Sequence, residues 1–216
     1  MSDLTVWGRL SSCNVQKVIW VLEELGLPYE HIPLGGKFGG LDDPDYLAMN
    51  PNGRVPTLRD GELILWESDA IVRYLCARYG AGGLWPEDPV DRAPIEQWST
   101  WGTTELLGDW IALFWRLVRT PEDKRKPHII ERHLALTSQR MTLLDRHLAG
   151  HDYMVGNTLT MADIPAGMTL YRWYEMEIER PDTPHMDAWY AKLCERPAYQ
   201  KGICVPFDDL VGRQDF

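Results

Sequence analysis

The stretch NPNGRVPTL at residues 50–58, with the dipeptide DG at residues 60–61, decides the fold of this chain. Asn, Pro and Gly in close succession are typical of a turn, and the residues after it are mostly apolar. The DG dipeptide strongly favours a two-residue hairpin turn. The sequence therefore predicts two antiparallel strands, at residues 55–59 and 62–66.

The residues that precede this hairpin predict a strand, a helix and a second strand. Residues 4–8 alternate apolar with small or polar side chains, as a short strand does. Apolar residues then recur at helical spacing from residue 14 to residue 25, and Gly26 with Pro28 predicts the end of the helix. Residues 29–33 read as the second strand. This β-α-β order favours a parallel pair joined by a crossover helix.

Two further helices complete the first domain. Residues 43–49 predict a short helix before the turn, and Ser68 is expected to cap a helix after the hairpin. The predicted order is β-α-β-α-β-β-α over residues 1–80. Gly, Pro and Asp concentrate in the next segment, which predicts an interdomain linker at residues 81–90.

Strand patterns disappear after the linker. Residues 93–118 and 129–148 carry apolar side chains at helical spacing. Thr160 and Asp163 form a capping box, in which Thr160 accepts from the backbone of the third helical residue and Asp163 reaches back to the cap. Residues 91–216 are therefore predicted to form an all-helical domain.

Composition excludes several classes of protein. A net charge of −10 speaks against a nucleic-acid partner, because phosphates bind to clustered Lys and Arg. No apolar run approaches the roughly 20 residues that span a bilayer, and no signal peptide is evident, so we expect a soluble, cytoplasmic protein without a membrane partner. The four cysteines form no C-x-x-C pair and the histidines no convincing metal pattern, which predicts reduced thiols and no metal site.

Three motifs follow one another along the chain: residues 50–58, the pair Glu67-Ser68 and the box at residues 159–164. Together they resemble the glutathione S-transferase family, over nearly the whole chain. The resemblance implies an α/β thioredoxin-like N-terminal domain followed by an all-α domain, which holds the second-substrate pocket and part of the dimer interface. It also implies a homodimer that uses glutathione as co-substrate, needs no other cofactor and transfers its sulfur to a small hydrophobic electrophile.

The resemblance also implies how the tripeptide binds. Pro56 would follow a cis peptide bond, and the backbone of Val55 would pair with the cysteinyl part of glutathione, because a peptide lying beside a strand needs an exposed N–H and C=O. Ser68 would hold the γ-glutamyl carboxylate at the start of a helix, where N–H groups are free to bind an anion. Glu67 would hold the ammonium group. An ordinary helix cap is the alternative for Ser68.

The thiol site is expected where the first strand passes to the first helix. A hydroxyl or amide donor there stabilises a thiolate and lowers its pKa. The resemblance points to Ser12 as the catalytic donor, with Asn14 assisting and Ser11 as the main alternative. Cys13 lies one position beyond the expected register, and its side chain is expected to point into the helix packing, which favours Ser12. A cysteine in that role would direct the site towards mixed-disulfide chemistry instead.

Leu41 departs from the pattern of the family. Many serine-type members carry His or Gln at this position to bind the glycine carboxylate, and Lys37 or Arg54 could replace it. Trp7 and Leu10, at the end of the first strand, are candidates to lie beside the thiol and contact the second substrate. The alternatives to a transferase are a glutathione-dependent disulfide reductase and a non-catalytic module for ligand binding or dimerisation, which Leu41 favours.

Overall fold

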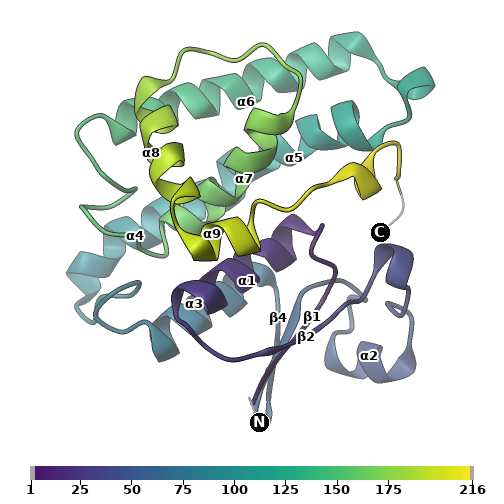
Figure 1. The fold of residues 1–216 in the computed structure, drawn as a ribbon, viewed down its shortest axis with the longest axis vertical. Helices are drawn as coiled ribbons and strands as arrows, with labels where there is room; N and C mark the ends of the chain where they lie inside the picture. Colours follow the sequence, from purple (N-terminus) through teal and green to yellow (C-terminus); the bar gives the residue numbers. More distant parts are fainter. Residues whose placement is uncertain (1–2, 215–216) are drawn as a thin grey trace.

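The computed structural model describes residues 3–214, and its N-terminal part has the predicted order of elements (Figure 1). The elements are β1 (Leu4–Trp7), α1 (Cys13–Glu24), β2 (Glu30–Ile32), α2 (Pro44–Met49), β3 (Thr57–Asp60), β4 (Leu63–Trp66) and α3 (Ser68–Tyr79). The sheet has the order β2-β1-β3-β4. β1 and β2 are parallel, whereas β1 with β3 and β3 with β4 are antiparallel. The predicted crossover and hairpin are both confirmed.

Gly8 lies where the end of β1 approaches α1 closely. Its φ angle is 149°, in the region that favours glycine. A Cβ atom at this position would lie 2.4 Å from a methyl carbon of Val15 on α1. A side chain therefore has no room here, and the chain can turn from β1 directly into the loop that precedes α1.

The C-terminal part is helical. Its helices are α4 (Pro89–Trp101), α5 (Leu107–Phe114), α6 (Pro127–Leu148), α7 (Asp163–Glu175), α8 (Pro184–Cys194) and α9 (Pro197–Gly202). π-helical turns at Gly102–Leu106 and Trp115–Arg119 flank α5 on both sides. Such turns are rare in proteins as a whole, but those that occur often lie at functional sites. Here they flank α5, which lines the cavity described below.

Three boundaries differ from the sequence-based expectation. α1 begins at Cys13, one residue before the expected start at Asn14. Ser68 is the first residue of α3 and not its cap, because Glu67 occupies the cap position. α4 begins at Pro89, inside the segment predicted as a linker, since proline is well suited to the first position of a helix. The domain limits themselves stay a prediction.

The start of α7 is held by buried side-chain hydrogen bonds. The Asp163 carboxylate accepts from the backbone N–H of Met154 and of Thr160, each at 2.8 Å. This confirms that Asp163 reaches back to the cap. The Thr160 hydroxyl, however, accepts from Ala162 N–H at 3.3 Å and not from the third helical residue. Burial of the carboxyl raises the pKa of Asp163 to about 7, although the hydrogen bonds from Met154 and Thr160 oppose the shift.

α1 joins the two parts of the molecule. It packs against α3 on the sheet side and against α7 and α9 on the helical side (Figure 1). The segment after α9 returns to the start of α1, where the Ser11 hydroxyl donates to Asp209 at 2.8 Å. Within residues 3–214, none of the helices combines the length and apolar character that a membrane span requires.

Candidate active site

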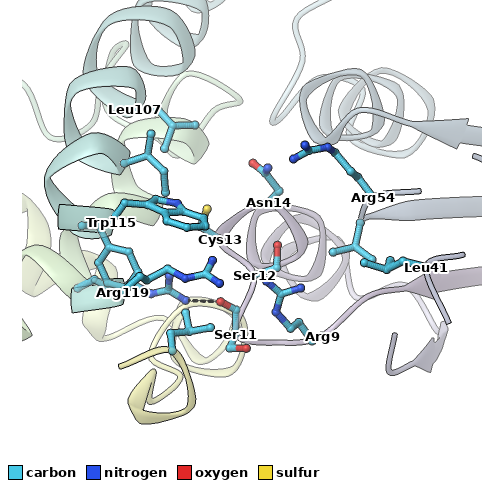
Figure 2. A pocket seen from close by; sticks show the side chains of 15 residues that line it. Arg9, Ser11, Ser12, Cys13, Asn14, Leu41, Arg54, Leu107, Trp115 and Arg119 are labelled. Atoms are coloured by element: carbon cyan, nitrogen blue, oxygen red, sulfur yellow. Dashed lines mark hydrogen bonds between the residues drawn. The ribbon is translucent and has the colours of Figure 1, made fainter. Parts of the chain in front are cut away.

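A cavity of about 370 Å³ opens between the sheet part and the helical part (Figure 2). Residues 11–14, at the start of α1, line its centre. Leu41, Arg54 and Val55 line one side, and α5 with the π-helical turn after it lines the opposite side. The cavity therefore brings together segments from both parts of the chain, as a site for two substrates requires.

Ser11 and Ser12 differ in what their hydroxyl groups do. Ser11 is buried and its hydroxyl donates to Asp209. Ser12 is the N-cap residue of α1, but its side chain makes no capping hydrogen bond, and its hydroxyl has no hydrogen-bond partner among residues 3–214. Its hydroxyl is therefore available to a bound molecule, next to helix N–H groups that have no intrahelical acceptor.

A hydrogen bond connects the starts of α1 and α3. The Ser68 hydroxyl donates to Asn14 Oδ1 at 3.2 Å. Just before Ser68, Glu67 has a φ angle of 71°, and it is the one residue other than glycine with a positive φ in the described part of the chain. Such backbone strain persists where the surrounding structure enforces it and often marks a functional position. The hydrogen bond joins the predicted γ-glutamyl region to the predicted thiol region, although neither Glu67 nor Ser68 is among the residues that line the cavity.

Side-chain hydrogen bonds hold the loop that carries Val55. The Val55-Pro56 peptide bond is cis. The Arg54 carbonyl accepts from the Tyr46 hydroxyl at 2.6 Å and from the Asn50 side-chain amide at 2.8 Å. In contrast, no hydrogen bond within residues 3–214 uses the backbone N–H or C=O of Val55. The loop therefore presents one free peptide edge on the wall of the cavity.

Cys13 also lines the cavity. It is half-buried, and Figure 2 shows its sulfur on the side of Trp115 and Arg119. The sequence analysis favoured Ser12 partly because the Cys13 side chain was expected to turn into helix packing. The structure corrects this point, because the thiol both packs against the core and faces the cavity.

The structure separates the candidates for the glycine carboxylate. Arg54 lines the cavity beside Leu41. Lys37 lines a neighbouring hollow instead, with its ammonium group 5.3 Å from the Phe38 ring centroid. Leu10 lines that second hollow too. The sequence-based expectation that Trp7 and Leu10 lie beside the thiol is not supported, because neither is among the residues that line the main cavity.

Sequence reasoning missed three residues that line the cavity, namely Arg9, Arg119 and Arg172. All three are buried. Arg172 bridges the two parts of the molecule, because its guanidinium donates to the carbonyl of Ser11 at 2.8 Å. Its position on a helix of mostly apolar residues was the available signal, since a buried arginine there needs a reason. Among the helical-domain aromatics, Phe114 and Trp115 line the cavity.

Comparisons with known proteins identify a single family. Residues 7–83 match the family model for the glutathione S-transferase N-terminal domain, and residues 111–197 match the model for the C-terminal domain. Glutathione S-transferase GstB of Escherichia coli is 42% identical over 94% of this chain and 99% of its own. Glutathione S-transferase 3 of Zea mays is 31% identical over 95% of each chain.

A solved structure is similar over the whole fold. The theta class glutathione S-transferase from Xanthomonas axonopodis pv. citri, with glutathione bound, has a TM-score of 0.91 and 47% identity. The match covers 96% of this chain and 100% of that one. The chain belongs to the glutathione S-transferase family, which confirms the family, the fold and the transferase class predicted from its sequence.

Proposed function

We propose that the protein binds reduced glutathione in this cavity and transfers its sulfur to a small electrophile. The uncommitted hydroxyl of Ser12 at the start of α1 carries the proposal, because it can donate to a thiolate. The thiol proton leaves to solvent, the sulfur forms a bond to the electrophilic carbon, and the leaving group departs with the electron pair. Binding both reactants side by side supplies the rest of the rate enhancement.

The tripeptide would lie across the centre of the cavity. The free peptide edge of Val55 would pair with the cysteinyl residue, and Ser68 with Glu67 would bind the γ-glutamyl end. Asn14 would assist Ser12 at the thiol. Arg54, which lines the cavity, is a better candidate for the glycine carboxylate than Lys37, which lines the neighbouring hollow. By family, we further propose a homodimer that acts in the cytoplasm and needs no cofactor beyond glutathione.

Calorimetric titration with reduced glutathione, and then with glutathione disulfide, tests the binding proposal. We expect saturable heat with the reduced form and weaker binding of the disulfide. Absence of heat with both compounds would overturn the proposal and favour a non-catalytic module. A dilution series by size-exclusion chromatography with light scattering tests the proposed dimer.

Glutathione-dependent disulfide reduction is the second candidate, and the position of Cys13 on the cavity wall favours it. In that reaction, glutathione attacks a mixed disulfide of glutathione and a small thiol, which yields glutathione disulfide and the free thiol. Turnover of such a substrate that is lost in Cys13→Ala would assign the reaction to a protein thiol. Turnover that survives this change would assign it to Ser12 and Asn14.

A further inference from the structure

We infer that the helical side of the cavity accepts a small aromatic electrophile that carries a carboxylate, and that Arg172 and Arg119 bind this carboxylate. The inference rests on the proposed function and names the class of its second substrate. It differs from the sequence-based expectation of a hydrophobic electrophile by adding one negative charge.

The charge of the cavity wall is opposite to the charge of the chain. The protein has a net charge of −10. Yet Arg9, Arg54, Arg119 and Arg172 line the cavity, and within residues 3–214 its lining contains no Asp or Glu. A concave surface lined by one sign of charge concentrates ligands of the opposite sign. An acidic protein with such a wall is suited to an anionic substrate.

Arg172 is the centre of this positive region. Only 2% of its surface is exposed, and one guanidinium nitrogen donates to the Ser11 carbonyl. The guanidinium also lies 5.0 Å from the Phe114 ring centroid and 5.5 Å from that of Phe207. Its Nε is buried and has no acceptor among the described residues. A buried charge is costly unless an opposite charge compensates it, and a substrate carboxylate would do so.

Arg119, Arg9 and Asp209 are among the charged groups that act on Arg172. Burial lowers the pKa of Arg172, and the charges of Arg119 and Arg9 lower it further. Asp209 and Cys13 oppose the shift. The Asp209 carboxylate already accepts from the Ser11 hydroxyl. An incoming carboxylate would therefore meet the guanidinium of Arg172 beside those of Arg119 and Arg9, with the Asp209 carboxylate also nearby.

The apolar residues of the same wall indicate the remainder of the substrate. The Arg119 guanidinium lies 4.0 Å from the centroid of the Trp115 ring. Leu107, Ile111 and Phe114 complete this side of the cavity. Figure 2 shows Trp115 and Arg119 across the cavity from Arg54, which leaves Arg54 for glutathione. An aromatic ring on the apolar wall with its carboxylate at the arginines would satisfy both kinds of group.

Two electrophiles that differ only in charge test the inference. They are 4-chloro-3,5-dinitrobenzoate and 4-chloro-3,5-dinitrobenzamide, assayed at saturating glutathione. In each reaction the glutathione sulfur bonds to the ring carbon and chloride leaves, so the chemistry is the same. After division by the rate without protein, we expect kcat/KM for the carboxylate to exceed that for the amide by about 10-fold or more, as for a charge-assisted hydrogen bond.

Variants assign the preference to particular residues. Arg172→Gln and Arg119→Gln should each abolish most of the preference for the carboxylate, whereas Arg172→Lys should retain part of it. Arg116→Gln is the matched control, because Arg116 is exposed on the same π-helical turn as Arg119 and does not line the cavity. The ratio of two substrates within one variant is insensitive to the fraction of folded protein, so a loss of stability does not imitate the result.

Two outcomes separate this inference from the proposed function. If both compounds are turned over equally well, or if the preference survives in both glutamine variants, the inference is wrong and the transferase proposal stands. If neither compound is turned over, calorimetry with the unreactive 3,5-dinitrobenzoate and 3,5-dinitrobenzamide decides the anion site alone. Tighter binding of the benzoate that Arg172→Gln removes would support the site even then, and equal binding would overturn it.

Discussion

Two helix starts in this molecule use similar residues in opposite ways. At α7, Asp163 and Thr160 satisfy nearby backbone N–H groups, and the Asp163 side chain is completely buried. At α1, the cap residue Ser12 has a hydroxyl group that the described part of the protein does not use, and it faces a cavity. Both starts lie against the same core, since α1 and α7 pack together.

The difference indicates which helix start serves stability and which serves binding. Four N–H groups at any helix start need acceptors, and buried ones are normally satisfied by the protein. When the protein supplies the acceptors, as at α7, removing them should destabilise the fold. At α1 the protein leaves donors free beside a cavity. Removing the side-chain donor there should impair ligand binding or turnover without a large loss of stability. The following predictions test this separation.

The largest effect is expected for Asp163→Asn. The amide can accept only at its single oxygen, so one of the two backbone N–H groups of Met154 and Thr160 would face an NH₂ group. We expect a loss of about 3 kcal/mol in the free energy of unfolding, as for a broken buried network. Urea denaturation measures the loss, and turnover per folded molecule should be unchanged. A change below about 0.5 kcal/mol would contradict the structural role of this helix start.

The same residue gives a pH dependence with a definite sign. The pKa of Asp163 is raised from its ordinary value of 3.8 to about 7 in the folded protein. The folded state therefore binds more protons than the unfolded state between these values, so this contribution to stability is present below about pH 4 and is lost as the pH rises through about 7. Unfolding free energies of the wild type and Asp163→Asn should differ most at low pH. A difference that grows towards pH 8 would contradict the raised pKa.

The next effect in size is expected for Ser12→Ala. Loss of one preorganised donor to a developing or existing anion lowers kcat by about 100-fold. The binding of glutathione should change far less, because in the proposed complex the hydroxyl contacts only the thiol. The free energy of unfolding, measured by thermal denaturation, should stay within about 0.5 kcal/mol of the wild type, since the Ser12 side chain makes no capping hydrogen bond. Equal losses in kcat and in glutathione affinity would make Ser12 a binding residue instead.

The elements that local chemistry dictates could be predicted from sequence. The hairpin follows from Asp60-Gly61, the capping role of Asp163 from its spacing to Thr160, and the end of α1 from Gly26. These features depend on neighbours within a few residues. The resemblance to the family then supplied Ser12, Val55 and Pro56, and the structure does bring Ser12 and Val55 to one cavity.

The positive wall of the cavity could not be predicted, because it is assembled from distant segments. Arg9 follows β1, Arg119 ends a π-helical turn and Arg172 lies on α7. No spacing rule connects these positions. Lys37 illustrates the same difficulty, since its closeness in sequence to Leu41 did not predict that it lines a different hollow. Contacts between the two parts of the chain decide which side chains meet.

A smaller effect is expected for Ser68→Ala, which removes the side-chain hydrogen bond between the starts of α1 and α3. Its hydroxyl donates to Asn14, and its position suits the γ-glutamyl carboxylate. We expect the Kd for glutathione to rise about 10-fold, which corresponds to one hydrogen bond to a charged group. Calorimetry measures the change. Ser68→Thr, which keeps the hydroxyl, is the matched control and should bind nearly as well as the wild type.

The smallest effect is expected for Ser11→Ala, and it completes the comparison. Ser11 lies next to Ser12 at the same helix start, yet its hydroxyl is already bonded to Asp209 in the returning C-terminal segment. Its removal should cost about 1 kcal/mol of stability, as for an ordinary hydrogen bond, and should leave kcat within about threefold of the wild type. Urea denaturation and steady-state kinetics on the same preparation measure both quantities. If Ser11→Ala lowered kcat as strongly as Ser12→Ala, the thiol donor would be Ser11, and the hydrogen bond to Asp209 would have to break when glutathione binds.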